Sequence, residues 1–279
     1  MKSAVKPTCR LDERKLQFIS GYDSIVAGSD QIWNTKLTYG NYIYFLPFIS
    51  GIKKISYAAS IGMRDFPEED KNAIAGYLKD FDHISVREPV AQDAIEKLIG
   101  KRPQLVIDPS LLLNKKEYES IKGHQIIKKK YILLYLRHKD SKIVSHVRKM
   151  ADTSGLQIVE LNRITKTFRD SKIVRQPNPK MWLRLIWDAE YIFTDSFHGC
   201  AFCINLNKPF FVMISSANSE MSSRIYHILD RYGMKDRLIT EETDIMTMPN
   251  PNFEESNKLL AQDREYAINY LKSALSINA

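Results

Sequence analysis

The segment of residues 191–214 constrains the fold of this chain more than any other. An apolar run at residues 191–193 is followed by a polar turn, a short helical pattern and a second apolar run at residues 210–214. Strand, turn, helix and strand in this order form a βαβ unit, which predicts a parallel sheet. Ligands of open α/β sheets bind at the carboxyl ends of the strands, and the polar turn lies at such an end.

The turn in this segment contains residues that suit an anion and a proton transfer. Ser196 or Asp195 can cap the helix, and Gly199 lets the backbone come close to a ligand. A helix N-terminus has partial positive charge and favours anions, and His198 there can donate or accept a proton near neutral pH. The alternative is a histidine that only hydrogen-bonds within a turn, and the motif alone leaves both interpretations open.

Strand and helix patterns alternate twice along the chain. The first series has strands near residues 25, 55, 84 and 105, and the second has strands at residues 131–136, 157–161, 172–174, 191–193 and 210–214. This alternation predicts an α/β fold of two domains with parallel sheets. We expect an N-terminal domain at residues 1–118, a C-terminal domain at 119–250, and a final helix at 251–279 that packs on a domain face. No glycine-rich GxGxxG or Walker loop follows a strand, which argues against a standard dinucleotide or P-loop NTPase site.

Two strand ends in the first half have polar residues. Ser29, Asp30 and Gln31 follow the first strand and can hydrogen-bond a polyol or a phosphate, or form an Asx turn that caps a helix. Arg87 follows the third strand and could bind a carboxylate or phosphate with two hydrogen bonds. It could equally form an ion pair with Glu88 or Asp93.

Composition narrows the class of ligand. The chain has 279 residues, of which 44% are apolar and 27% charged, and we expect a cytoplasmic, globular protein. Its net charge of +8 suits anionic ligands, and no nucleic-acid-binding signature accompanies it, so we expect no nucleic-acid partner. Cys200 and Cys203 have Cys-x-x-Cys spacing without a second pair, which favours buried packing over redox or metal chemistry. We expect no metal site.

Five segments together resemble the polysaccharide pyruvyl transferase family. The similarity extends from about residue 22 to about residue 238, and each segment is weak alone. In order, the segments are Gly28-Ser29-Asp30-Gln31-Ile32-Trp33-Asn34, Ser56-Tyr57-Ala58-Ala59-Ser60-Ile61-Gly62, Ser85-Val86-Arg87-Glu88, Asp108-Pro109-Ser110-Leu111-Leu112 and Ser196-Phe197-His198-Gly199.

The resemblance implies two Rossmann-like domains in a GT-B-like arrangement. It also implies transfer of pyruvate from phosphoenolpyruvate to a pair of sugar hydroxyls, which forms a ketal in cell-surface polysaccharide biosynthesis without a further cofactor. Members usually open with a strand and a loop rich in glycine and asparagine before the Gly-Ser-Asp segment. Only about twenty residues precede that segment here, so we expect a first domain that is truncated at its N-terminus.

The family motif Arg-x-His-Gly assigns expected roles. His198 and Gly199 match it, whereas Ser196 stands where many members have an arginine. The donor-binding group is therefore expected to comprise Ser196, Gly199 and arginines that replace the missing one, for which the candidates are Arg87, Arg137 and Arg224. His198 is expected to transfer protons, with Asp30 as the second acid/base and with Ser29 and Gln31 binding the acceptor.

The resemblance also implies partners and leaves alternatives. We expect phosphoenolpyruvate and a glycan or lipid-linked glycan precursor as substrates, with peripheral association at the inner face of the membrane and self-association as further expectations. The alternatives are a GT-B glycosyltransferase that uses a nucleotide sugar, and a non-catalytic family member that binds glycan.

Overall fold

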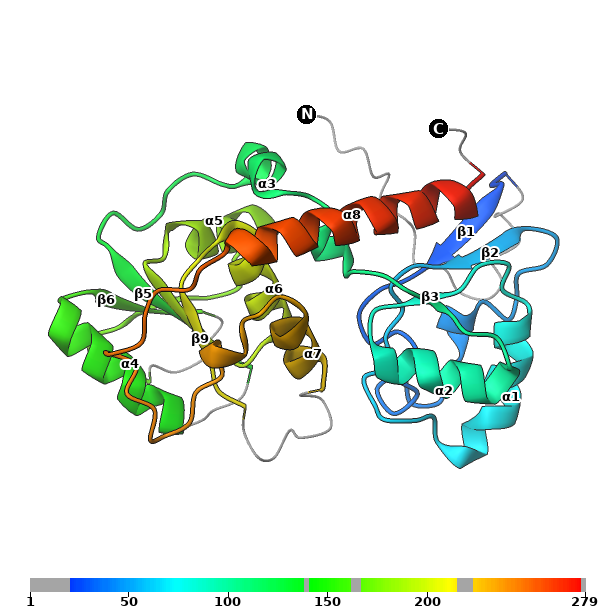
Figure 1. Ribbon diagram of the computed structural model, residues 1–279, viewed down its shortest axis with the longest axis horizontal. Helices are drawn as coiled ribbons and strands as arrows, with labels where there is room; N and C mark the ends of the chain where they lie inside the picture. The colour runs from blue at the N-terminus through cyan, green and yellow to red at the C-terminus, as the bar shows by residue number, and fades with distance from the viewer. Residues whose placement is uncertain (1–20, 138–140, 162–166, 215–222, 277–279) are drawn as a thin grey trace. The chain divides into compact units, whose positions relative to one another are not determined.

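The chain forms two compact α/β units. The computed structural model describes residues 21–137, 141–161, 167–214 and 223–276 (Figure 1). By their internal contacts, unit 1 comprises Met1–Asp108 with Ala267–Ala279, and unit 2 comprises Pro109–Tyr266. The domain limit expected at residue 118 falls inside a helix of unit 2.

Unit 1 is built on four short parallel strands. They are β1 (Ser24–Ala27), β2 (Lys53–Ser56), β3 (Ser85–Val86) and β4 (Gln104–Leu105). β1 pairs with β2 and β3 pairs with β4, and single bridges from Ile55 to His83 and from Ala59 to Val86 join the two pairs. The strands therefore follow one another in sequence order, and their carboxyl ends lie at one edge.

The helices of unit 1 begin and end as their sequences predict. α1 (Glu68–Lys79) has three acidic residues in its first turn, which suits the positive end of the helix dipole. α2 (Pro89–Ile99) has proline at its first position and stops at Gly100, whose φ of 70° lies in the left-handed region. A short 3-10 helix, η2 (Ile43–Phe45), precedes β2.

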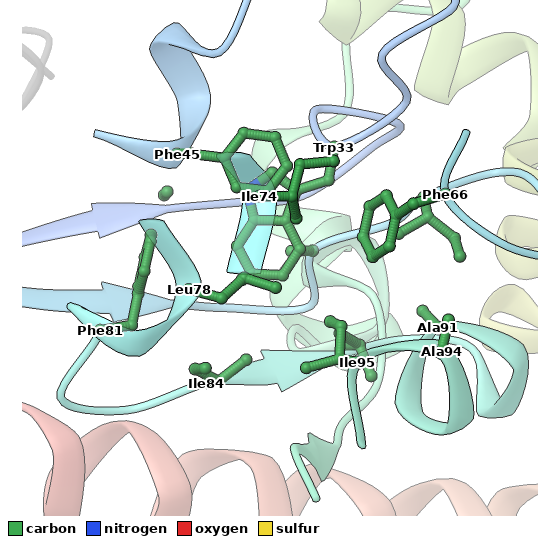
Figure 2. Close-up of a cluster of buried hydrophobic side chains, with 14 of the residues drawn as sticks. Trp33, Phe45, Phe66, Ile74, Leu78, Phe81, Ile84, Ala91, Ala94 and Ile95 are labelled. Atoms are coloured by element: carbon green, nitrogen blue, oxygen red, sulfur yellow. The ribbon is translucent and has the colours of Figure 1, made fainter. Parts of the chain in front are cut away.

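The core of unit 1 centres on one tryptophan. Trp33 is fully buried and stacks on Phe45, with ring centroids 5.3 Å apart and an interplanar angle of 8°, and the edge of Phe81 meets its ring (Figure 2). Ile74 and Leu78 of α1 pack into the same cluster. Residues 74, 78 and 81 have the spacing of one helix face, which suits their joint packing in this cluster.

Unit 2 contains a five-stranded parallel sheet. Its strands are β5 (Tyr131–Tyr135), β6 (Gln157–Leu161), β7 (Lys172–Val174), β8 (Tyr191–Thr194) and β9 (Phe210–Val212). Their order across the sheet is β7-β6-β5-β8-β9. Counted from β5, this is the doubly wound order 3-2-1-4-5, in which the direction of winding reverses between β5 and β8.

The helices of unit 2 flank this sheet. They are α3 (Lys115–Ile121), α4 (Ser141–Ser154), α5 (Pro179–Asp188), α6 (Phe197–Leu206) and α7 (Ser223–Arg231), with short 3-10 helices η3 (Pro109–Leu111) and η5 (Lys235–Arg237). Ile132 and Leu134 of β5 join the apolar cluster of α4, whereas Tyr131 donates a hydrogen bond to Leu185 of α5 and Tyr135 meets Trp182 of α5. Because side chains alternate along a strand, α4 and α5 cover opposite faces.

The last helix, α8 (Glu254–Ala274), starts in unit 2 and ends in unit 1. Its buried positions include Leu260, Ala267 and Ala274, which are spaced by seven residues and share one side of the helix. Tyr266 and Ile268 are exposed, because each lies one residue, about 100° of rotation, away from this buried side.

Candidate functional site

The carboxyl edge of the unit 2 sheet gathers several residues singled out in the sequence. β5 and β8 are neighbours, with Tyr135 opposite Thr194, and the reversal of winding lies between them. The backbone N–H of Arg137, just beyond β5, donates to the Asp195 carboxylate, just beyond β8, at 2.6 Å. Ligands of doubly wound sheets bind at this kind of edge.

Helix α6 begins at this edge. Ser196 is its N-cap: the Ser196 hydroxyl accepts from the Gly199 N–H at 3.4 Å, and the Thr194 hydroxyl accepts from the Ser196 N–H at 3.1 Å. Of the two capping residues considered, Ser196 is therefore the one that caps, while Asp195 binds the backbone of Arg137. The Ser196 side chain is buried in this role.

Gly199 is required by the protein's own packing. A Cβ added at residue 199 would lie 2.3 Å from Oγ1 of Thr194, which is far too close. The absence of a side chain therefore lets the first turn of α6 lie against the end of β8. The expected approach of Gly199 to a ligand stays a prediction.

His198 and Arg224 meet the same aromatic ring. His198 is the second residue of α6 and half-buried, and its ring contacts Phe197 edge to face at 5.3 Å. Arg224 is the second residue of α7, and its guanidinium lies 5.8 Å from the centroid of the Phe197 ring. Helices α6 and α7 pack together in unit 2 (Figure 1). Two cationic or titratable side chains therefore gather at the N-terminus of α6, where an anion is favoured.

The two cysteines of α6 belong to the core. Cys200 and Cys203 are fully buried, and burial raises the pKa of both thiols. The buried packing favoured by the sequence is what the structure has. In the part of the chain that the structure describes, no group of three His, Cys, Asp or Glu residues could hold a metal ion.

The carboxyl edge of unit 1 has a different cluster, centred on Arg87. Its guanidinium lies 2.5 Å from the Asp108 carboxylate, 2.6 Å from that of Asp30 and 3.6 Å from that of Glu88. Ser29 donates to Asp108 at 3.0 Å, and Ser60 donates to Glu88. These residues follow β1, β2, β3 and β4, so all four strand ends contribute to one network.

Carboxylates are prominent in this network. The described ion pairs join one guanidinium to three carboxylates. Burial alone would lower the pKa of Arg87, but Asp108, Glu88 and Asp30 outweigh burial and raise it. Between the pairings considered from the sequence, Arg87 contacts Glu88, whereas Asp93 pairs with Arg102. Donor binding by Arg87 stays a prediction that this geometry does not favour.

The residues that follow β1 pack tightly against their neighbours. The Gln31 side chain accepts from the Asn34 amide at 2.9 Å. A Cβ at Gly28 would lie 2.0 Å from the carbonyl oxygen of Tyr57, so only glycine fits there. The sequence interpretation gave no role to Asp108, although it follows a strand end as Arg87 does, and that position was the available signal. It also gave none to Phe197, for which no signal was available.

The two α/β units with parallel sheets, the second in doubly wound order, define a protein of the GT-B fold class. A putative UDP-N-acetylglucosamine 2-epimerase from Listeria monocytogenes is similar at a TM-score of 0.53 and 11% identity, covering 96% of this chain and 78% of that one. The UDP-GlcNAc 2-epimerase of Neisseria meningitidis gives a TM-score of 0.46 at 10% identity, covering 98% of this chain and 78% of that one. The identity of the first is so low that it shows the fold alone.

The family follows from the sequence. The model of the polysaccharide pyruvyl transferase family matches residues 3–217. The chain belongs to this family, and the resemblance seen in the five segments is confirmed. No curated protein matches the sequence significantly. No helix within the described ranges has the length and apolar character needed to cross a membrane.

Proposed function

We propose that this chain is a transferase that moves pyruvate from phosphoenolpyruvate to a pair of sugar hydroxyls and so forms a ketal on a polysaccharide or its precursor. The observation that carries the proposal is the position of His198 in the first turn of α6, at the winding reversal of the unit 2 sheet. Family membership supplies the reaction class.

The unit 2 edge suits the donor. Phosphoenolpyruvate has a phosphate and a carboxylate, which call for positive potential and several hydrogen-bond donors. The N-terminus of α6 supplies partial positive charge, and Arg224 and Arg137 lie near it. In the proposed reaction His198 donates a proton to the methylene carbon, which leaves an oxocarbenium-like centre for an acceptor hydroxyl to attack. Phosphate then leaves as the second hydroxyl closes the ketal.

The unit 1 edge suits the acceptor. Sugar hydroxyls donate hydrogen bonds that carboxylates accept well, and an exposed carboxylate does not favour an anionic donor at the same place. Asp108 and Glu88 are buried, whereas 60% of the Asp30 side chain is exposed while Arg87 holds it at 2.6 Å. We therefore assign Asp30 the role of orienting the acceptor or removing its proton, with Ser29 and Gln31 beside it. The reaction as proposed needs no cofactor or metal.

Phosphate release tests the proposal. The protein is incubated with phosphoenolpyruvate and a panel of glycan and lipid-linked glycan precursors, and inorganic phosphate and the mass of the glycan are measured. We expect phosphate release that depends on the acceptor, with one pyruvate ketal added to the glycan. Release of a nucleoside diphosphate from a nucleotide sugar would instead support a glycosyltransferase, and glycan binding without turnover would support a non-catalytic member.

The nature of the acceptor affects where the protein would act. A lipid-linked precursor would bring the chain to the membrane surface, and we propose peripheral association there. Co-sedimentation with vesicles that contain the precursor tests this part separately from turnover.

A further inference from the structure

The loop after β1 displays large side chains to solvent although its backbone is tightly organised. The Asn34 carbonyl accepts from the N–H groups of Leu37 and Thr38, both at 3.0 Å, and the Thr35 carbonyl accepts from Gly40 at 2.9 Å. Yet Leu37, Tyr39 and Tyr44 are 54%, 95% and 47% exposed. Exposed apolar groups on an ordered loop mark binding surfaces more often than isolated exposed residues do.

The backbone conformation at residue 39 does not favour a tyrosine. Its φ of 53° lies in the left-handed region, where asparagine and glycine are favoured and an aromatic residue is not. Tyr42, in the same loop, shows the opposite arrangement: its hydroxyl donates to Asp70 at 2.5 Å, and its ring packs on Phe45 and Tyr77. The loop therefore uses one tyrosine for its own fold and presents two others.

The base of this loop is joined to the proposed acceptor residues. Asn34, whose side chain also accepts from Leu37 N–H, donates to the Gln31 side chain at 2.9 Å. On the other side, the Trp33 indole N–H donates to the carbonyl of Tyr44 at 3.2 Å, while the Trp33 ring is fixed by stacking on Phe45 (Figure 2). Residues 33 and 34 thus connect the backbone of the loop, at Leu37 and Tyr44, to the side chain of Gln31.

We propose that the loop of residues 35–44 is a sugar-stacking subsite, in which Tyr39 and Tyr44 hold units of the acceptor glycan next to the one that reacts. The proposal rests on the acceptor role given to the unit 1 edge. Aromatic rings offer a flat apolar face and, in tyrosine, a hydroxyl, which together match the apolar faces and hydroxyls of a sugar. The carboxylates of the adjoining network disfavour an anionic lipid surface as the occupant.

Two variants remove the rings without a folding cost. Tyr39→Asn places a residue that accepts a positive φ, and Tyr44→Ala keeps the carbonyl that binds Trp33. The matched control is Tyr22→Ala, because Tyr22 is 67% exposed in the same unit but precedes β1 and so lies at the amino end of the strand. Circular dichroism of all three variants checks that they are folded.

Binding to a printed array of bacterial oligosaccharides of one to six sugars tests the proposal without needing turnover. We expect the wild-type chain and Tyr22→Ala to retain the longer oligosaccharides, and the double Tyr39→Asn, Tyr44→Ala variant to lose about tenfold or more in apparent affinity for them. Equal binding by wild type and the double variant, or no retention of any oligosaccharide by the wild type, would overturn the subsite.

Two further arms separate the outcomes. Phosphate release from phosphoenolpyruvate is measured on the same samples: loss of glycan retention in the double variant without any turnover in the wild type would keep the subsite and remove the pyruvyl transfer. Vesicles of phosphatidylcholine with phosphatidylglycerol are the last probe. Vesicle binding that disappears in the double variant, without loss of oligosaccharide binding, would assign the loop to a lipid surface and overturn the proposal.

Discussion

The two units place polar residues at equivalent edges of parallel sheets, but the kinds of side chain at these edges differ. In unit 2 the chain leaves β8 directly into helix α6, so a helix N-terminus, His198 and Arg224 gather there. In unit 1 the chain likewise leaves β3 for helix α2 within two residues, but there the buried Arg87 contacts three carboxylates. A parallel sheet therefore decides where a ligand can bind, and the side chains of the loops decide which ligand.

One glycine of each unit, Gly28 and Gly199, also differs in what surrounds it. At Gly28 the space that a Cβ would need is occupied by a backbone carbonyl, that of Tyr57. At Gly199 it is occupied by a side chain, that of Thr194. The constraint at Gly28 comes from the backbone, so no single substitution of Tyr57 removes it. The constraint at Gly199 comes from the Thr194 side chain and can be removed by a substitution there.

The largest effect is expected at His198. Replacement by glutamine keeps size and some hydrogen bonding but removes titration near pH 7, and should lower turnover by about two to four powers of ten. Binding of phosphoenolpyruvate should survive, because α6 and Arg224 remain. Steady-state phosphate release and calorimetric titration measure the two quantities, with His124→Gln, at an exposed histidine of unit 2, as control. Near-wild-type turnover would leave His198 as a turn residue.

Arg87→Ala should break the unit 1 network. Removing the guanidinium deprives the buried carboxylates of Asp108 and Glu88 of the Arg87 charge. This loss should destabilise unit 1 by about 3–5 kcal/mol. Arg102→Ala removes an exposed arginine from its pairs and should cost less than about 1 kcal/mol.

Fluorescence can follow this unit alone. Trp33 is the one tryptophan outside α5, so Trp182→Phe and Trp187→Phe leave a reporter of unit 1 for denaturant titration. Equal stability of the Arg87→Ala and Arg102→Ala variants would show that the network does not hold the edge together.

The glycine pair should give a smaller and more selective effect. Gly199→Ala should destabilise by about 1–3 kcal/mol through crowding against Thr194, and Thr194→Ala should restore part of that loss. Gly28→Ala has no such rescue, because its obstacle is the backbone of Tyr57. A double-mutant cycle by denaturant titration measures the coupling, and additive effects of Gly199→Ala and Thr194→Ala would rule out the contact.

Mild acid should loosen unit 2 slightly. Burial is the main cause that lowers the pKa of His227 below its usual 6.5, against the opposing influence of Asp230. The unfolded chain therefore binds more protons than the folded one, so the stability supplied by neutral His227 is present above pH 6.5 and lost as the pH falls toward its folded pKa. Protection of the α7 amides, relative to their intrinsic exchange rate at each pH, should fall on acidification, and His227→Gln should flatten that fall. An equal fall in the variant would contradict the assignment.

Much of the local structure follows from the sequence. The bounds of β6 and β7 were predicted to the residue, because the pattern of apolar residues is a local signal. The N-cap at Ser196 was one of two predicted residues for the same reason.

The sites depended on contacts that no local pattern encodes. Arg87 contacts Asp30 and Asp108, which lie 57 and 21 residues away in the sequence. These two ion pairs could therefore not be predicted from a local pattern. The reason for Gly199 lies in the packing of α6 on Thr194. The exposure of Tyr266 depends on which side of α8 is buried, and the apolar residues at positions 259, 260, 266, 268 and 271 do not single out that side.

The measurement that tests the division of roles most directly is a titration with phosphoenolpyruvate followed by backbone amide NMR. If unit 2 binds the donor, the amide signals of Arg137, Asp195, His198, Gly199 and Arg224 should shift with one saturation curve, while those of residues 28–31 and 87 stay in place. Shifts confined to the carboxylate network of unit 1, or no saturable shift in either unit, would contradict the account.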